Sequence, residues 1–379
     1  NACGIPGLKY MIYASKHLPL KIYINIPSCV PPKPEFESSS YELKLRDLSG
    51  LIDINSIVGL GEVMDFDGVV NANKRLLSEI VYFLNHEKII EGHAPLLSGT
   101  KLNAYLSAGI TSDHQCVQKQ EALEKLRRGM YIFIRESSIS KNLKEVIKII
   151  TEEHVNDSFV SLCTDDITPK DLLDLGHLNN VIKRAIEEGV DPVVVYRLAT
   201  LNPAIHYNMQ NIIGSIAPFR IADVLLLEDV RKPKPKIVIA NGKIVAVNGK
   251  MIIQIKKVHT PKDILNSINR IKVNAESFKF NLREGNYIAN VIQVVEGTSH
   301  TKLLKIPVYV NNSGEIVSDY ILNKVAVIHR RTGKSSLALV AGFDIVKKGA
   351  VATSYSHDTH NIVVVGSDEE SMSHSKSKF

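Results

Sequence analysis

Between residues 21 and 166, short apolar runs alternate with segments of helical periodicity, and this alternation limits the folds that the chain can adopt. The apolar runs are residues 21–27, 56–64, 88–95, 106–114, 130–138 and 159–166. They are apolar on both faces, as is typical of buried parallel strands. We therefore predict an α/β fold, an incomplete TIM-like (β/α) barrel that lacks its first two strands. A doubly wound open sheet is the alternative.

Four side chains of metal-binding types lie at the ends of four of these runs, and each is separated from the next by one or two units of strand plus helix, about 20 to 30 residues each. They are Glu62, His93, His114 and Asp165. In a barrel the C-terminal ends of the strands meet on one face, so these side chains are expected to converge. Imidazole and carboxylate groups suit zinc, manganese or iron. A polar strand end explains each residue alone, but the four in phase predict a metal site.

The same four residues predict a type of reaction. A bound metal lowers the pKa of water to about 7 and so supplies a nucleophile at neutral pH. A carboxylate that stays partly free can take the proton of that water and pass it to a leaving nitrogen. Asp165 is the candidate for this role. Hydrolysis at a purine or amide carbon needs such a nucleophile, and the sequence therefore predicts a metal-dependent hydrolase.

Further polar residues at the ends of these runs are predicted to bind substrate. Asp166 directly follows Asp165, and adjacent strand residues point to opposite faces, so one could bind metal and the other substrate. Arg135 and Glu136 could bind the donors and acceptors of a planar base. The alternatives are that Asp166 caps a helix beginning near Pro169, and that Arg135 and Glu136 serve a structural ion pair.

Two helical segments are predicted after residue 166, over residues 169–189 and 192–208, and the pattern then becomes β-rich. We predict a barrel domain over residues 1–215, a small β-domain over 216–256, a C-terminal β-rich domain over 257–370 and a disordered tail over 371–379. Asn241 and Gly242 predict a tight turn between two strands of the small β-domain. The tail is predicted to be disordered because it has no apolar periodicity.

The sequence SHDTHN, residues 356–361, is dense in polar groups and lies between a strand of small residues and an apolar run. It contains His357, Asp358 and His360, which we predict to contact the substrate. A surface turn is the alternative.

Composition excludes several classes of partner. The net charge is +6 and the basic residues are scattered, which argues against a nucleic-acid partner. The sequence has no apolar run of about 18 residues, so no contact with a membrane is expected. The four cysteines are far apart and form no CxxC pair, which favours a reduced, cytoplasmic protein.

Long segments of the chain resemble the adenine deaminase family of the amidohydrolase superfamily. The resemblance rests on GLGEVMDFDGV, EGHAPLLSGTKLNAYLSAGITSDHQ, EALEKLRRGMYIFIRESSISKNL, LCTDD, LATLNPA, IAPFRIADVLLLEDV and SHDTHNIVVVG. It implies hydrolysis of adenine to hypoxanthine and ammonia in purine salvage, on a TIM-like barrel with a binuclear manganese or iron centre. The implied partner is adenine, a small molecule, and the resemblance leaves a homo-oligomer open.

The resemblance also implies a role for each candidate ligand. Glu62 corresponds to the carboxylate that bridges the metals, and His93 and His114 to ligands from the next two strands. Asp165 corresponds to a ligand that also carries the proton, and Asp166 lies near the base. Asp165, Glu62 and His114 are thus the predicted catalytic residues.

The sequence departs from the family pattern in ways that leave other functions open. It has neither the family's first-strand HxH pair nor its Asp-Pro-His-Glu segment, and we expect a chain truncated at both ends. Gln115 stands where the family has glutamate. The alternatives are another metal-dependent amidohydrolase or base deaminase, and an inactive pseudoenzyme or fragment with a binding role.

Overall fold

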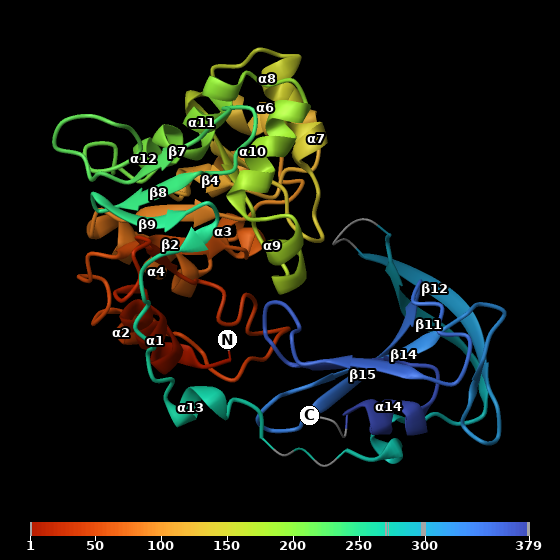
Figure 1. Ribbon diagram of the computed structural model, residues 1–379. Helices are drawn as coiled ribbons and strands as arrows, with labels where there is room; N and C mark the ends of the chain where they lie inside the picture. The colour runs from red at the N-terminus through yellow and green to blue at the C-terminus, as the bar shows by residue number, and fades with distance from the viewer. Residues whose placement is uncertain (1, 270, 272, 297–300, 377–379) are drawn as a thin grey trace. The chain divides into compact units, whose positions relative to one another are not determined.

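The computed structural model describes residues 2–269, 271, 273–296 and 301–376 (Figure 1). The chain divides into two compact units. The barrel unit contains Lys9–Pro32 and Lys44–His259, and the C-terminal unit contains Asn1–Leu8, Lys33–Leu43 and Thr260–Phe379. Each unit is described by itself below.

The described part of the barrel unit contains six parallel strands that follow one another in chain order. They are β1 (Ile24–Ile26), β2 (Ile57–Val63), β3 (Ile89–Gly92), β4 (Ser112–Asp113), β5 (Tyr131–Arg135) and β6 (Val160–Cys163). Ladders join β1-β2-β3 and β4-β5-β6, and the amide of Thr111 connects the two groups by donating to the Ile90 carbonyl at 2.9 Å. A doubly wound sheet reverses its strand order at a switch point. The order seen here confirms the predicted incomplete (β/α) barrel.

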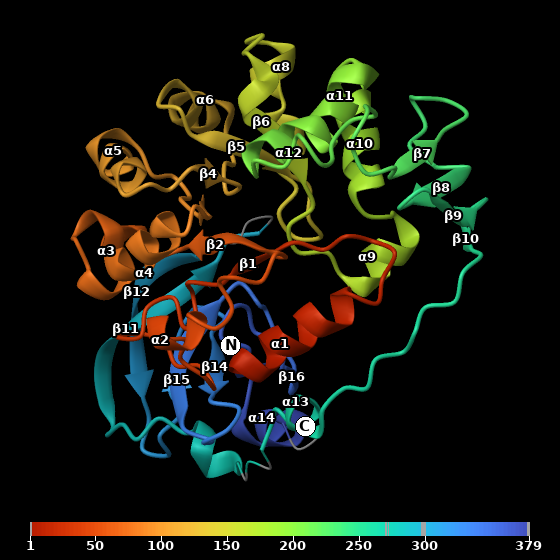
Figure 2. The same ribbon diagram turned by 90° about the vertical axis from the view of Figure 1, so that its left-hand side faces the viewer.

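Helices follow the strands and cover their outer side, as Figure 2 shows for α3, α5, α6 and α8. In α4 (Lys74–Asn85), Leu76, Ile80 and Phe83 are buried at helical spacing, and the Asn73 side chain caps the first turn by accepting from the Leu76 amide. The other helices of this region are α1 (Gly4–Ser15), α2 (Leu45–Leu48), α3 (Phe66–Val70), α5 (Gly99–Ser107), α6 (Lys119–Arg127), α7 (Leu143–Val146) and α8 (Lys148–Thr151).

The helical pattern after β6 forms shorter helices than its length suggests. They are α9 (Pro169–Asp174), α10 (Leu178–Glu187), α11 (Pro192–Ala199) and α12 (Leu201–His206). Gly176 separates α9 from α10 with a φ of 104°, a conformation that favours glycine and ends a helix. The side chains of α10 and α11 then pack on β5 and β6 in one apolar core, which includes Ile132, Leu162, Val181 and Leu198.

The small β-domain is an antiparallel sheet in the order β10-β9-β8-β7. Its strands are β7 (Val224–Leu226), β8 (Ile237–Ala240), β9 (Lys243–Val247) and β10 (Lys250–Met251). Asn241 and Gly242 join β8 to β9 with φ values of 51° and 74°. Positive φ at both central residues is typical of the tight hairpin turn that the sequence predicted.

The described part of the C-terminal unit contains a seven-stranded sheet in the order β13-β12-β11-β15-β14-β17-β16. Its strands are β11 (Gly285–Val294), β12 (Thr301–Val310), β13 (Ile316–Val317), β14 (Asn323–Ile328), β15 (Ser335–Ala341), β16 (Ala350–Thr353) and β17 (Ile362–Gly366). The unit also contains α13 (Lys262–Leu265) and α14 (Glu369–Lys376). The predicted β-rich C-terminal domain is thereby confirmed.

Two features of the C-terminal unit differ from the sequence predictions. The prediction of a disordered tail is wrong for residues 371–376, because α14 docks there with Met372 fully buried among residues such as Phe278 and Val364. Residues 377–379 lie outside the described residues. Residues 33–43, placed in the predicted barrel domain, instead bond within the C-terminal unit, where the Asn361 side-chain amide donates to the Ser38 carbonyl at 2.7 Å.

Within the described ranges, no helix combines the length and the apolar character needed to cross a membrane.

Candidate metal centre

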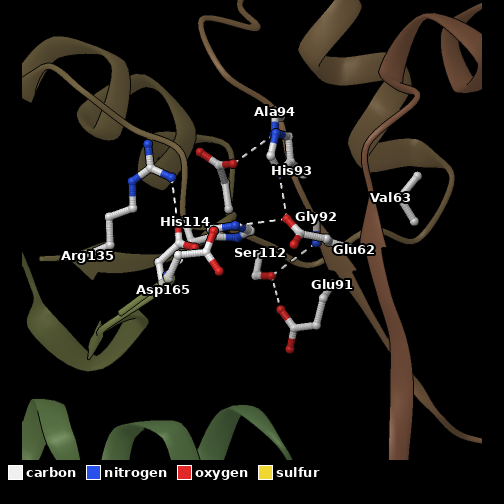
Figure 3. A network of polar contacts seen from close by, with 12 residues as sticks. Glu62, Val63, Glu91, Gly92, His93, Ala94, Ser112, His114, Arg135 and Asp165 are labelled. Carbon is white, nitrogen blue, oxygen red and sulfur yellow. Dashed lines mark hydrogen bonds and ion pairs between the residues drawn. The ribbon is translucent and has the colours of Figure 1, made fainter. Parts of the chain in front are cut away.

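Glu62, His93 and His114 come together at the C-terminal ends of β2, β3 and β4 (Figure 3). The Glu62 Oε2 atom lies 2.5 Å from His93 Nδ1 and 2.9 Å from His114 Nε2. The two imidazole rings meet edge to face, with centroids 5.3 Å apart. All three side chains are half-buried, so the cluster is accessible from solvent. Residues separated by up to 52 positions thus share one site because neighbouring parallel strands end side by side.

The charges of this cluster depend on one another. Burial raises the pKa of Glu62, but the two histidines outweigh burial and hold that pKa well below its usual range. Burial by itself lowers the pKa of His114, but the Glu62 carboxylate outweighs burial and raises that pKa to about 9. Two imidazole nitrogens facing one carboxylate oxygen form a donor set that suits a divalent ion such as zinc, manganese or iron. The residues present therefore fit a metal site.

Asp165 is held by Arg135 beside this cluster. Arg135 Nη1 donates to Asp165 Oδ2 at 2.6 Å, and its Nε donates to Asn142 Oδ1 at 3.0 Å. The Arg135 side chain is only 4% exposed, so this is a largely buried ion pair. Among the described residues, Glu62, His93 and His114 form one group of possible ligand atoms that lie within 4.8 Å of one another, and Asp165 is outside that group. Asp165 is nevertheless close enough to His114 to raise the pKa of that imidazole.

Asp165 and Asp166 were expected to point to opposite faces of a strand. This does not apply, because β6 ends at Cys163, before both residues. Asp165 has a φ of 57°, in the left-handed region, which turns the chain away from the strand direction. The Asp166 amide then donates to Asp165 Oδ1 at 2.7 Å. Thr168, rather than Asp166, caps α9 by accepting from the Asp171 amide.

Glu136 lies at the end of β5 but faces a different cavity from the metal cluster. Its Oε2 accepts from the Leu143 amide at 3.3 Å, and its Oε1 lies 3.9 Å from Arg184. Burial raises the pKa of Glu136. The side chain lines a cavity of about 430 Å³ together with charged groups that include Lys141, Asp171 and Arg184.

His357, Asp358 and His360 lie in the C-terminal unit, between β16 and β17. His357 Nδ1 lies 2.5 Å from Asp358 Oδ1. The His360 carbonyl accepts from Arg330 at 2.6 Å, and its ring meets Tyr355 edge to face. Their role in substrate binding stays a prediction.

Two buried polar groups next to the cluster were not anticipated from the sequence. In the first, Lys125 of α6 donates to the Asp113 carboxylate at 2.8 Å, and Asp113 directly precedes the ligand candidate His114 in the sequence. The helical spacing could have indicated this burial, because Lys125 lies three residues after Ala122 and beside Leu126, on the apolar stripe of α6.

The second unanticipated group surrounds Glu91, which lies two residues before His93 on β3. Its Oε1 lies 2.8 Å from His206 Nε2 and its Oε2 accepts from the Ser112 hydroxyl. His206 closes α12, packing its ring on Tyr131 at 4.4 Å. A buried carboxylate, an imidazole and a hydroxyl group thus bond to one another next to the metal cluster.

Comparison with known proteins identifies the family of the chain. The model of the amidohydrolase family matches residues 1–245. The chain belongs to the amidohydrolase family. The model of the adenine deaminase C-terminal domain matches residues 298–378. Membership of the amidohydrolase family implies a divalent metal as the cofactor.

Curated relatives cover nearly the whole chain. An adenine deaminase of Staphylothermus marinus is 38% identical over 98% of this chain and 63% of its own length. An adenine deaminase of Clostridium acetobutylicum is 37% identical over 98% of this chain and 65% of its own length. An adenine deaminase of Thermosipho africanus is 36% identical over 100% of this chain and 65% of its own length. The predicted resemblance to adenine deaminases is confirmed, and the chain spans just under two thirds of the length of these relatives.

Solved structures are more distant. An adenosine deaminase from Xanthomonas campestris with bound zinc is 13% identical, with a TM-score of 0.44 over 69% of this chain and 68% of that one. An N-acetylglucosamine-6-phosphate deacetylase from Pasteurella multocida is 13% identical, with a TM-score of 0.42 over 55% and 62%.

Proposed function

We propose that this amidohydrolase catalyses the metal-dependent deamination of adenine to hypoxanthine and ammonia. The observation that carries the proposal is the match of 98% of the chain to relatives named adenine deaminase, at 36–38% identity. The match of residues 298–378 to the model of the adenine deaminase C-terminal domain supports the same activity. The histidine and carboxylate cluster at the barrel mouth supports the proposal with suitable chemistry.

In this proposal Glu62, His93 and His114 hold the divalent metal, with manganese or iron as the preferred ion. Their donor atoms lie within 4.8 Å of one another, close enough to share an ion. A divalent metal supplies Lewis acidity, which makes water a better nucleophile toward a carbon–nitrogen bond. The three side chains are half-buried, so solvent reaches the site.

Asp165 is the proposed proton carrier of the reaction. Deamination consumes one water for each ammonia released, so a proton must move from the attacking water to the departing amine nitrogen. The Asp165 carboxylate lies beside His114, and the Arg135 guanidinium fixes its Oδ2 atom at 2.6 Å. Arg135 therefore acts in this proposal on Asp165, not on the substrate. Asp166 remains a proposed contact of the adenine base, whereas the predicted contact of Glu136 is not retained because Glu136 lines the separate cavity beside Arg184.

The direct test is adenine turnover followed by ultraviolet absorbance, with the purified chain loaded with Mn²⁺, Fe²⁺ or Zn²⁺. We expect turnover, and we expect Glu62→Gln and His114→Ala each to lower kcat/KM at least about 100-fold. His86→Ala is the matched control, because His86 is exposed at the end of α4. A folded, metal-loaded chain that leaves adenine unchanged would contradict the proposal.

Parallel assays with other bases and cyclic amides separate the remaining possibilities. Turnover of one of these compounds without adenine turnover would indicate another amidohydrolase or base deaminase. Metal binding without turnover of any of them would indicate a binding role.

A further inference from the structure

A buried lysine bonds to residues that adjoin the proposed ligands His93 and His114 in the sequence. The Lys125 side chain on α6 is 0% exposed. Its Nζ donates to the Ala94 carbonyl at 2.6 Å, to Asp113 Oδ2 at 2.8 Å and to Glu121 Oε1 at 2.6 Å. An ammonium has three N–H donors, and these three acceptors match them. Burying an ammonium group without partners costs free energy, so the folded state is favoured only while these three acceptors stay in place. The contacts therefore restrain the backbone around Lys125.

The residues that Lys125 binds adjoin the two histidine ligand candidates. Ala94 directly follows His93, and Asp113 directly precedes His114. The Ala94 amide donates to Asp113 Oδ1 at 2.8 Å, while the Ala94 carbonyl accepts from Lys125. Both polar groups of Ala94 are therefore tied to the Asp113–Lys125 pair. Figure 3 shows Ala94 and His93 on one side of the cluster and His114 on the other.

The same contacts also hold the loop after His93 at a second point. Glu121 Oε1 accepts from the Leu96 amide at 2.7 Å, and its Oε2 accepts from the Val117 amide at 3.1 Å. Leu96 belongs to the loop after β3, and Val117 to the loop after β4. Glu121 thus bridges the two loops, and Lys125 neutralises it.

Asp113, Cys116 and Glu121 by themselves resemble a metal site, since their donor atoms lie within 4.8 Å of one another. Two observations exclude that interpretation. Lys125 contacts both carboxylates directly and so supplies the positive charge itself. Burial raises the pKa of the Cys116 thiol well above its ordinary value, and that thiol donates to Asp113 instead of offering a thiolate.

We propose that Lys125 is a positioning residue that sets the distance between His93 and His114 by joining the loops that carry them. This proposal rests on the proposed metal centre, and it assigns the residue that holds the two imidazoles at the distance needed to bind one metal ion. Outer partners of metal ligands typically contribute 10- to 100-fold in metal affinity or activity. Loss of the Lys125 contacts is therefore expected to weaken metal binding by about 10- to 100-fold.

The test measures Co²⁺ binding to the wild-type chain and to Lys125→Met, which keeps the length of the side chain and removes its charge. The dissociation constant comes from competition with a chelator, and the visible absorption of bound Co²⁺ reports the geometry of its ligands. We expect the weaker binding given above and a shifted or less intense Co²⁺ spectrum. Ile149→Ala is the control, because Ile149 is fully buried in α8 and does not belong to the two loops.

A second variant covers the case in which Lys125→Met does not fold. Asp113→Asn and Glu121→Gln combined with Lys125→Met remove all three charges of the cluster together, yet the contact to the Ala94 carbonyl is still lost. Either folded variant binding Co²⁺ with wild-type affinity and spectrum would overturn the proposal. So would a control Ile149→Ala that weakens binding and changes the spectrum as much as the Lys125 variants.

The outcome separates this proposal from the proposed function. A wild-type chain that binds Co²⁺ but does not convert adenine contradicts the proposed function alone, and the Lys125 comparison still decides the present proposal. A wild-type chain that does not bind Co²⁺ overturns both.

Discussion

At the level of single residues, charges at the barrel mouth are balanced by neighbouring side chains. Glu62 is bound by two imidazoles, and Asp165 is bound by Arg135. Each carboxylate therefore keeps a fixed orientation before any ligand arrives. A preorganised carboxylate loses little freedom when it takes part in a reaction, and this favours catalysis.

Replacing Arg135 tests this balance, because it removes the buried partner of Asp165. We expect Arg135→Met to lower the free energy of unfolding by about 2 kcal/mol, the scale of a lost hydrogen bond to a charged group. Turnover of adenine should fall at least about tenfold because Asp165 loses its orientation. Urea denaturation and the absorbance assay measure the two effects.

The control for Arg135 is Arg128→Met, which removes an arginine from a partly exposed pair with Glu124 on α6. Such pairs contribute about 0–1 kcal/mol. Equal losses of stability and turnover in the two variants would contradict the proposed role of Arg135.

At the level of elements, the barrel strands could be predicted from the sequence because each is a local apolar run. Their convergence on Glu62, His93 and His114 follows from the way parallel strands end on one face. Lys125 could not be assigned with similar ease, because a lysine in a charged helical segment is usually solvated. Its burial depends on acceptors that come from β4 and from the loop after β3.

Helix α14 shows a second limit of local patterns. Its sequence has little apolar periodicity, yet Met372 fills a space beneath the sheet of the C-terminal unit. The Ser375 hydroxyl donates to the Ala350 carbonyl at 3.0 Å and adds a polar contact. Tertiary packing, not helical propensity, therefore orders this segment.

Met372→Ala tests the docking of α14. Removing this fully buried side chain should lower the free energy of unfolding of the C-terminal unit by about 2–4 kcal/mol, through lost burial and a residual cavity. His374→Ala, on the exposed side of the same helix, should change it by less than about 0.5 kcal/mol. Thermal unfolding measures both, and a similar small effect of the two substitutions would show that α14 does not dock.

At the level of the whole molecule, each of the two units has apolar cores of its own. The barrel unit is built around residues such as Ile132, Leu162 and Leu198, and the C-terminal unit around residues such as Phe278 and Val364. The proposed ligands Glu62, His93 and His114 all lie in the barrel unit. A ligand that binds only the folded form of one unit stabilises that unit.

Metal addition should therefore raise the unfolding midpoint of the barrel unit and leave that of the C-terminal unit unchanged. At a free metal concentration about 100 times the dissociation constant, the gain is about 2.7 kcal/mol. Scanning calorimetry with Mn²⁺ or with EDTA measures the shift, and Met372→Ala identifies the transition of the C-terminal unit by lowering its midpoint. His93→Ala should abolish the metal effect, because it removes one of the proposed ligands from the cluster. An equal shift of both transitions, or a shift that persists in His93→Ala, would place the metal elsewhere than at this cluster.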